Sequence, residues 1–428
     1  MKGALIFIGD ELIAGRILNT NAEFAGKVLS SIGVTIGEIV TIPDDEERII
    51  NTLKRLKEEY DFIITSGGLG PTEDDFTLLA LAKAFNLRLI QDEALISAIL
   101  SNKEYKSTLD MAKRMSFIPE GAQWLAEGES MVGFYLPYQE KLLLFLPGVP
   151  EQFQFLLKNK VLPILCNKEQ EKRKKEGCKE DRIIKNLVFF DLNETDLNKF
   201  MYTLVEEEPP KIGYYPIFPE VKVVLFGIKE KVEKFTEALN KRFKFNLVSK
   251  EDESLNQVIG RLLRSKGQTL TTAESCTGGM LASLITNISG SSAYFERGFI
   301  TYTEESKREI LGVSKETLEQ YGVYSYETAL EMAIGAKRLA RTHYALSTTG
   351  IAGPTGGTSE IPVGTVFIGL ATPSKAFAFH FHFNGDRITI QRIASFTALD
   401  ILRRYILYGE SFFSYRFALG IKERTLES

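Results

Sequence analysis

The sequence predicts an α/β protein built from more than one domain. Its 428 residues exceed what a single hydrophobic core usually supports. In the first part of the chain, short apolar runs alternate with amphipathic segments, which is typical of parallel βαβ units. In the last part, glycine-rich stretches directly follow apolar runs, which places flexible backbone at predicted strand ends. These features together favour several α/β units joined in one chain.

The first elements follow one another without interruption. In order they are a strand at 4–8, a helix at 21–33, a strand at 34–42, a helix at 44–60, a strand at 61–65 and a helix at 76–85. Ligands of such sheets bind at the carboxyl ends of the parallel strands. Polar clusters at those ends are therefore the first candidates for a functional site.

Composition excludes several classes of protein. The 52 basic and 56 acidic residues leave a net charge of −4, which argues against a nucleic-acid partner. Cys166, Cys178 and Cys276 form no CxxC pair, so neither a disulfide framework nor a zinc site is indicated. The apolar run near the N-terminus is too short for a signal peptide or a membrane span. We expect a cytoplasmic protein that does not bind membranes and acts on small molecules.

One polar cluster follows the strand at 61–65. Gly67, Gly68 and Gly70 allow the backbone to approach a ligand closely, and Thr72 precedes the next predicted helix. Backbone N–H groups at such a loop and helix N-terminus attract anions. The pattern is typical of a phosphate-binding loop.

Four acidic residues accompany this loop. They are Asp10, Glu11, Asp74 and Asp75. Carboxylates beside a phosphate repel it unless a divalent cation lies between them, so the set predicts a magnesium-like metal site. The alternative is that Asp74 and Asp75 cap the helix and that Asp10 and Glu11 are solvated loop acids.

The middle of the chain carries weaker signals. Residues 86–150 are less regular and end in a strand at 141–148, which a helix at 151–165 follows. The charged run 167–182 indicates a solvated linker or a helix end. Residues 183–249 read as strand, helix, strand, strand and helix, which predicts a small α+β module without a catalytic constellation.

The stretch 270–279, LTTAESCTGG, is the most informative segment. An apolar run ends at Ser275, and Gly278 and Gly279 precede a helical pattern. A sharp turn from strand to helix exposes one side chain in front of free N–H groups, which suits a nucleophilic serine. The alternative is that Ser275 only caps the helix.

Other segments bring polar groups to the same edge of the predicted sheet. Tyr302 ends a strand at 295–303, and Lys307 lies in the first turns of the next helix, where a solvated lysine is the alternative. In the segment 345–371, the glycines around Thr349, Gly350 and Gly353 indicate backbone that approaches a ligand, although a long hairpin loop is the alternative.

The helix at 385–409 and the histidines complete the pattern. Arg387 and Arg392 near the start of that helix could bind a phosphate or a carboxylate. His343, His380 and His382 fall in no motif. A serine nucleophile here would need a base other than histidine, and a lysine with a lowered pKa can serve.

These strings resemble one known family along nearly the whole chain, the competence/damage-inducible protein A (CinA) family in its long form. The matching strings are GDEL (9–12), GGLGPTEDDFT (67–77), LPGVP (146–150), TAESCTGG (272–279), GFITY (298–302), TGIAGPTGGT (349–358), PVGTV (362–366) and GDR (385–387). The resemblance implies a three-layer molybdopterin-binding-like domain at 1–166, a linker with a small α+β module at 167–249, and a C-terminal α/β amidase domain at 250–428.

For the C-terminal domain, the resemblance implies hydrolysis of nicotinamide mononucleotide to nicotinate mononucleotide and ammonia, without a cofactor, in pyridine-nucleotide salvage. Ser275 would be the nucleophile and Lys307 its base, with Tyr302 and Thr349 assisting. The expected substrate-binding residues are Gly278, Gly279, Gly350, Gly353 and either Arg387 or Arg392.

For the N-terminal domain, the resemblance implies a metal-dependent ADP-ribose pyrophosphatase. Its phosphate loop would be Gly67, Gly68, Gly70 and Thr72, and its metal ligands would come from the four acids named above. The chain departs from the family pattern at 129–133 and at 191–196, so a nucleotide- or pterin-binding domain without catalysis is the alternative. A role on DNA is opposed by the acidic composition. The resemblance also implies a homo-oligomer.

Overall fold

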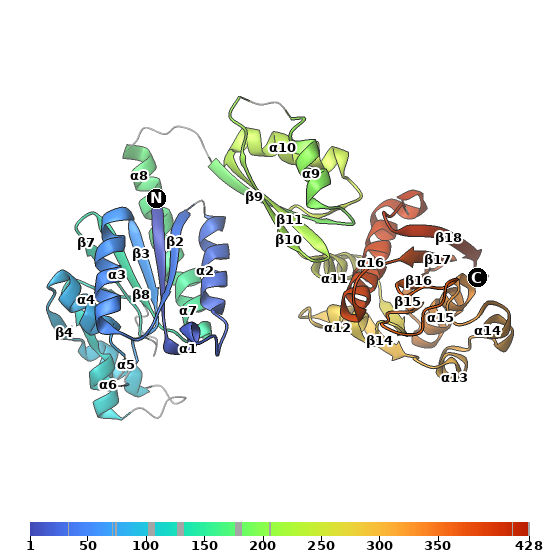
Figure 1. Cartoon of the computed structure of the whole chain (residues 1–428), viewed down its shortest axis with the longest axis horizontal. Coiled ribbons are helices and arrows are strands. Elements are labelled where there is room, and N and C mark those ends of the chain that lie inside the picture. The colour runs from blue at the N-terminus through green and yellow to red at the C-terminus, as the bar shows by residue number, and fades with distance from the viewer. Residues whose placement is uncertain are drawn as a thin grey trace. The chain divides into compact units, whose positions relative to one another are not determined.

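The computed structural model describes the chain except residues 33, 71, 73, 74, 102–107, 126–131, 176–181, 205–206, 413 and 427–428. The chain divides into two compact units, Met1–Ile184 and Lys185–Ser428. Figure 1 shows the first unit in blue to green and the second in light green to red. Each unit is described by itself.

A six-stranded sheet forms the centre of the first unit. Its order is β2 (Thr35–Ile42), β1 (Lys2–Ile8), β3 (Phe62–Ser66), β8 (Lys141–Leu146), β7 (Phe134–Tyr138) and β6 (Gln123–Trp124). The first four strands are parallel, and β7 and β6 run antiparallel to their neighbours. The carboxyl ends of β1 and β3 therefore lie at one edge, as the sequence predicts.

Helices cover both faces of this sheet and give a three-layer arrangement. Because strand side chains alternate, Leu5 and Phe7 of β1 pack with α2 (Thr20–Ser31) and α7 (Pro150–Leu156). Ala4 and Ile6 pack on the other face with α3 (Glu46–Glu59) and α4 (Thr77–Phe85). The remaining elements are α1 (Asp10–Ile13), β4 (Leu89–Gln91), α5 (Glu93–Ser101), α6 (Leu109–Met115), β5 (Phe117–Pro119), the π-helical turn η1 (Leu157–Val161) and α8 (Leu162–Lys175).

The second unit begins with the small α+β module. Its sheet has the order β10 (Lys211–Ile217), β11 (Glu220–Ile228), β9 (Arg182–Phe190) and β12 (Leu247–Ser249), with helices α9 (Glu194–Met201) and α10 (Lys229–Arg242). The predicted sequence of strand, helix, strand, strand and helix is confirmed. The charged run before it is in part a helix end, since α8 extends to Lys175.

A second six-stranded sheet follows. Its order is β14 (Phe295–Ile300), β13 (Leu270–Glu274), β15 (Tyr344–Gly350), β16 (Thr365–Ala371), β17 (Lys375–His382) and β18 (Ala418–Thr425). β13 lies between β14 and β15 and is parallel to both, whereas β15 to β18 are antiparallel. The ends of β13, β14 and β15 thus meet at one edge.

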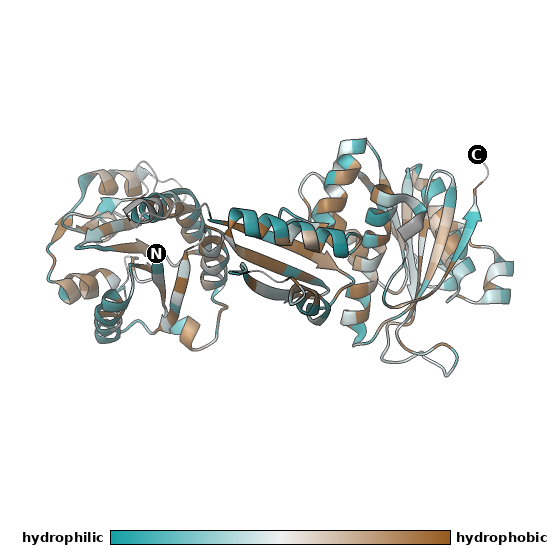
Figure 2. Cartoon of the chain, turned by 90° about the horizontal axis from the view of Figure 1, so that it is seen from above, coloured by the Kyte–Doolittle hydropathy of each residue, from teal (hydrophilic) through white to brown (hydrophobic). Residues whose placement is uncertain are grey.

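Helices again lie on both faces. On one face are α11 (Leu255–Lys266), α12 (Met280–Thr286) and α16 (Arg387–Tyr408), and on the other α15 (Tyr326–Ala340) and α14 (Lys315–Tyr321). The hydrophobic core under α11, α12 and α16 also contains Phe190 and Val248 of the small module. One apolar core therefore joins the module to this sheet. Figure 2 shows the apolar residues concentrated on strands and inner helix faces. Within the described residues, no helix is long and apolar enough to cross a bilayer.

Candidate active site

Ser275 stands directly after β13 and is 5% exposed. Its backbone N–H donates to the Thr348 carbonyl at 2.9 Å, which ties the turn to the neighbouring strand β15. Gly278 and Gly279 then adopt positive φ angles of 59° and 98°, a region that favours glycine and lets the chain turn into α12. The N-cap of α12 is Gly279, so Ser275 does not cap that helix and its hydroxyl remains available for another contact.

The capping role belongs to Glu274, which the sequence analysis missed. Its fully buried carboxylate accepts hydrogen bonds from the backbone N–H groups of Gly279, Leu281 and Ala282 at 2.8–3.0 Å. It also accepts from Thr277 Oγ1 at 2.7 Å. A carboxylate at a helix N-terminus is favoured by the helix dipole. The first N–H groups of α12 therefore bind Glu274 and do not point at a ligand.

Lys307 lies against Ser275. Its Nζ is 3.0 Å from Ser275 Oγ, 2.9 Å from the Thr301 carbonyl oxygen and 3.3 Å from that of Tyr302. The residue is 2% exposed, so it is not the solvated lysine of the alternative reading. Burial lowers the pKa of Lys307 to about 8, although nearby Cys276 and Glu304 oppose the shift.

Local structure explains how the lysine reaches this position. Thr303 and Ser306 form a capping box around the short helix α13 (Glu304–Ser306), and Lys307 begins the π-helical turn η3 (Lys307–Leu311). Such turns are rare and frequent at functional sites. A Cβ atom on Gly335 of α15 would lie 1.9 Å from the Leu311 carbonyl oxygen, so a glycine there lets α15 pack closely against η3.

A cavity of about 300 Å³ opens in front of Ser275 and Lys307. The predicted residues that line it are Ser275, Tyr302, Lys307, Gly350, Gly353 and Arg387. The sequence analysis did not single out Val323 and Tyr324, which also line it and belong to no string with a recognisable chemical pattern.

Arg387 is the arginine at this cavity. Its guanidinium donates to the Gly353 carbonyl at 2.7 Å and to Tyr302 Oη at 2.9 Å. Arg392 lies over the ring of Phe396, 6.0 Å from its centroid, and does not line the cavity. Thr349 is also outside the lining, because its hydroxyl donates to the Val323 carbonyl at 2.8 Å.

Cys276 lines the cavity beside Ser275, but its thiol is not suited to attack. Burial raises the pKa of Cys276 to about 12, and only the thiolate is an effective nucleophile. Apart from its own sulfur, no acceptor in the described part of the chain contacts its backbone N–H. The backbone of Cys276 can therefore donate to an oxygen atom of a ligand while its side chain stays inert.

The three histidines of the chain lie away from this cavity. His343 contacts Thr269, at 3.0 Å from its hydroxyl. His380 stacks on Phe367 with ring centroids 4.4 Å apart, and burial lowers its pKa. Lysine is thus the base that the site offers to Ser275.

The glycine loop of the first unit is placed by packing against the sheet. Gly67 and Gly68 have φ angles of +107° and +67°. Added Cβ atoms would lie 2.3 Å from the Ile8 carbonyl oxygen and 2.2 Å from Thr77 Oγ1. A cavity of about 200 Å³ beside the loop is lined by Gly68, Gly70, Thr72, Asp75 and Arg114, among others, and the sequence analysis missed Arg114.

Asp10 and Asp75, two of the predicted metal ligands that the structure describes, bind different partners. The Asp75 carboxylate accepts from the backbone N–H groups of Gly70 and Thr72, both at 2.8 Å, and from the Thr72 hydroxyl. Asp10 instead exchanges hydrogen bonds with Asp44 at 2.9 and 3.3 Å.

Within the described ranges, no group of three or more acidic, histidine or cysteine side chains could hold a metal ion. Glu11 lies in α1 next to Asp10. Asp74 and residues 129–131 lie outside the described residues.

Comparisons with known proteins agree with this architecture. Residues 4–167 match the family model of a probable molybdopterin binding domain, and residues 252–406 match that of the CinA C-terminal domain. The chain is 36% identical over 412 residues to a CinA-like protein of Desulfotalea psychrophila, covering 94% of this chain and 98% of the relative.

A second relative and a crystal structure extend the comparison. A putative competence-damage inducible protein of Thermoanaerobacter pseudethanolicus is 36% identical, with 95% and 99% covered. A crystal structure of the competence/damage inducible protein CihA from Agrobacterium tumefaciens is 39% identical over 35% of this chain and 95% of that chain, with a TM-score of 0.34. On 36% sequence identity over about 95% of its length, the chain belongs to the CinA family.

Proposed function

We propose that this protein hydrolyses the carboxamide of nicotinamide mononucleotide to nicotinate mononucleotide and ammonia, and thereby serves pyridine-nucleotide salvage. The observation that carries the proposal is the 3.0 Å contact between Ser275 Oγ and the buried Lys307 Nζ. A nucleophile within hydrogen-bond reach of a base with a lowered pKa is the arrangement that amide hydrolysis needs. The cavity of about 300 Å³ is within the range of small-molecule sites.

The contacts of Lys307 suggest how it serves as a base. The carbonyl oxygens of Thr301 and Tyr302 accept two of its N–H bonds, and its third direction faces Ser275 Oγ. In the neutral amine that direction holds the lone pair. Lys307 therefore takes the hydroxyl proton as Ser275 Oγ attacks the carboxamide carbon.

The same lysine serves the second half of the reaction. The Lys307 ammonium returns its proton to the departing nitrogen, which leaves as ammonia. The acyl group remains on Ser275 as an ester. A water molecule then transfers a proton to Lys307 and attacks the ester carbon, which releases the carboxylate and restores the Ser275 hydroxyl. The backbone N–H of Cys276 donates to the carbonyl oxygen as negative charge develops on it.

Arg387 is the proposed contact for the substrate phosphate. Its guanidinium is fixed by Gly353 and Tyr302 at the mouth of the cavity. Arginine suits phosphate because its planar donors can form two parallel hydrogen bonds. We assign Tyr302 a role in holding this arginine. We place Thr349 behind the site, where it fixes the backbone before Gly350.

Ammonia release from nicotinamide mononucleotide, measured in EDTA, tests this proposal. We expect turnover by the full-length protein, and a loss of roughly a thousand-fold or more in kcat for Ser275→Ala and Lys307→Met. Lys315→Met, which changes an exposed lysine, is the matched control and should keep full activity. An inactive wild-type protein, or an active Ser275→Ala variant, would refute the proposal.

For the first unit we propose that the glycine loop and Arg114 bind a phosphate-bearing nucleotide or pterin without turning it over. The family resemblance implies a divalent cation and ADP-ribose hydrolysis. The described carboxylates, however, bind their own loops and form no ligand set, so we derive no hydrolytic step there. Magnesium-dependent release of AMP from ADP-ribose would contradict this assignment, whereas binding without release would support it.

A further inference from the structure

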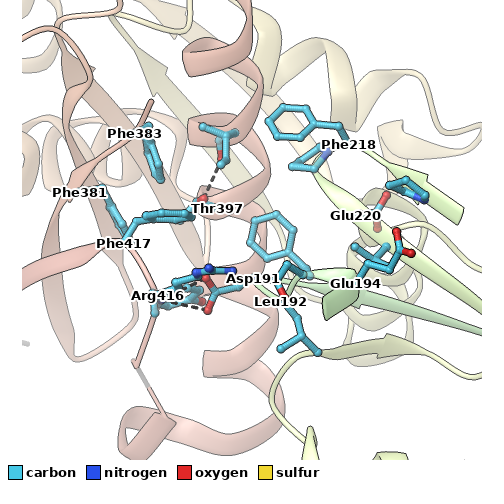
Figure 3. A pocket seen from close by; sticks show the side chains of 17 residues that line it. Asp191, Leu192, Glu194, Phe218, Glu220, Phe381, Phe383, Thr397, Arg416 and Phe417 are labelled. Carbon is cyan, nitrogen blue, oxygen red and sulfur yellow. Dashed lines mark hydrogen bonds between the residues drawn. The ribbon is translucent and has the colours of Figure 1, made fainter. Parts of the chain in front are cut away.

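A second cavity lies inside the Lys185–Ser428 unit, between the small module and the C-terminal sheet. Its volume is about 290 Å³. Figure 3 shows Phe381, Phe383 and Phe417 of the C-terminal domain on one side, and Phe218, Glu220 and Glu194 of the module on the other. The catalytic cavity at Ser275 shares none of these residues.

One wall of this cavity is aromatic and open. The rings of Phe381 and Phe383 stack with centroids 5.2 Å apart, and Phe417 meets Phe383 edge-on. Phe218 and Phe417 are 48% and 38% exposed. Aromatic side chains of this size stabilise a protein mainly when they are covered. A cavity with uncovered rings at its mouth is a surface suited to a planar aromatic ligand.

The opposite wall carries a carboxylate, that of Glu220, which accepts a hydrogen bond from the protein at one of its two oxygens. Glu220 is 8% exposed, and one of its oxygens accepts from the Leu255 backbone N–H at 2.9 Å. In the part of the chain that the structure describes, no hydrogen-bond donor contacts its other oxygen, which is not among the fully buried side-chain atoms that lack a partner and so keeps access to solvent. A carboxylate oxygen with that access can accept a hydrogen bond from a ligand. Glu220 is therefore an acceptor that a ligand in this cavity could satisfy.

The other charged residues of the lining do not make the charge of the cavity positive. Asp191 accepts from the Arg416 backbone N–H at 3.1 Å and from the Arg404 guanidinium at 3.4 Å, so its charge is compensated. The Arg416 guanidinium lies 3.8 Å from Asp196. Glu194 is exposed at the rim. The charge that the cavity leaves uncompensated is negative.

The aromatic residues of this region already accept cations. The Arg404 guanidinium carbon lies 4.0 Å from the ring centroid of Tyr415, and that of Arg416 lies 5.6 Å from Phe417. Attraction between a cation and an aromatic face is strongest where water is excluded. Aromatic walls with one free carboxylate favour a positively charged ligand over a neutral or negative one.

We propose that this cavity binds a small planar aromatic cation, with its ring against the phenylalanines and its amidinium or ammonium group on Glu220. The proposal is independent of the reaction proposed at Ser275, because the two cavities have separate linings. Its walls come from both the module and α16, whose first residue, Arg387, lines the catalytic cavity.

Protonation of Glu220 gives the proposal a second signature. Burial raises its pKa to about 7, and Asp400 adds to the rise. The Leu255 N–H, Arg392 and Arg403 oppose it. The other acids of the lining are Glu194 and Asp191, and burial raises the pKa of Asp191 to about 6. A cation binds the ionised carboxylate, so affinity should increase about tenfold from pH 6 to pH 8.

Calorimetric titration of the full-length protein with benzamidine tests the proposal, with benzoate and benzamide as anionic and neutral probes. We expect benzamidine to bind with a millimolar or lower Kd, benzoate not to bind, and Glu220→Gln to weaken benzamidine at least tenfold. The glutamine keeps an oxygen for the Leu255 N–H. Glu230→Gln, at an exposed position of α10, is the matched control.

Phe218→Ala provides a second variant, because the exposed ring contributes little to folding and should matter only for binding. It should weaken benzamidine without shifting the thermal midpoint by more than a degree or two. Benzamidine affinity that is equal in wild type and Glu220→Gln, or binding of benzoate as tight as that of benzamidine, would overturn the proposal.

Discussion

At the scale of single residues, the account depends on a lysine whose pKa the fold lowers. Burial lowers the pKa of Lys307 to about 8, whereas an unfolded lysine has a pKa near 10.4. Between these values the unfolded chain binds one proton more than the folded chain. The stability of the wild type should therefore rise with pH from about 8 to about 10 relative to a variant that lacks the amine.

Lys307→Met provides that reference. The free energy of unfolding of both proteins is measured by urea denaturation at pH 7 and pH 10. Between these pH values, we expect the wild type to gain a few kcal/mol of stability relative to Lys307→Met. A difference between the two proteins that stays constant with pH would mean that Lys307 is charged in the folded state.

Arg387 allows a test of substrate recognition. Arg387→Met should raise KM for nicotinamide mononucleotide about 10- to 100-fold and change kcat less, because the phosphate lies away from the reacting bond. Nicotinamide riboside, which lacks the phosphate, should be affected little. Arg392→Met is the control, since Arg392 lies over Phe396 outside the cavity. Equal losses with both substrates would place Arg387 elsewhere in the mechanism.

Sequence reasoning predicted several residues that line the cavity but not the residues that support them. Ser275, Lys307, Tyr302 and Arg387 stand at element boundaries, where chain order alone predicts that side chains meet at one sheet edge. Glu274 was missed because a carboxylate inside an apolar strand gives no sign of which helix it will cap.

At the scale of elements, the π-helical turn η3 depends on its neighbour α15. A methyl group at Gly335 would lie 1.9 Å from the Leu311 carbonyl oxygen, and backbone cannot yield as a flexible side chain can. Gly335→Ala should displace η3, destabilise the unit by about 2 kcal/mol and lower kcat. Thermal unfolding and ammonia release measure the two effects.

Gly26→Ala is the control for that substitution. Gly26 is a helical glycine in α2, and nothing lies within 4 Å of its added Cβ. The alanine should stabilise the protein by about 0.5–1 kcal/mol through its better helix propensity. If Gly335→Ala were also stabilising, the close packing of α15 on η3 would be wrong.

Most elements with a clear period were predicted within a few residues, and the exceptions have physical reasons. Helix α15 was missed because it is buried on several sides, from Thr328 to Ala340, so its pattern shows no single apolar stripe. Strand β18 was missed because most of its residues are exposed and the charged run Lys422, Glu423 and Arg424 shows no apolar alternation. Strand β7, which pairs with β8, was missed because its residues show no regular alternation of apolar and polar side chains.

At the scale of the whole molecule, buried charges hold the small module on the C-terminal domain. Arg403 is fully buried, donates to the carbonyl oxygens of Leu247 and Phe245, and pairs with Asp400 at 2.6 Å. Arg403→Met would leave the carbonyl oxygens of Leu247 and Phe245 without this donor, and buried Asp400 would keep Arg404 but lose its other arginine. We expect a loss of about 3–5 kcal/mol and separate unfolding of the module in calorimetry.

The control is Arg416→Met at the same junction. The Arg416 side chain is 47% exposed and lies 3.8 Å from an exposed aspartate. Its removal should cost less than about 1 kcal/mol. If both variants unfolded like the wild type, the module would be held by apolar contacts alone.

The predicted domain division shows what chain order cannot reveal. The boundary at 249/250 that the resemblance implies stays a prediction, and the hydrophobic core continues across it from Phe190 and Val248 into Leu255 and α16. Contacts between residues distant in sequence decide such boundaries, and a single sequence gives no direct sign of them. The same limit applies to the cavity between module and domain.

The central claim is that a buried lysine, whose pKa burial lowers to about 8, activates Ser275 in its neutral form. The most direct test is kcat/KM for ammonia release from nicotinamide mononucleotide in EDTA between pH 6 and pH 10, since this ratio reports the pKa of the free enzyme. The account predicts a tenfold rise per pH unit at low pH and a plateau above about 8. A profile that is flat or falls through this range would contradict Lys307 as the base.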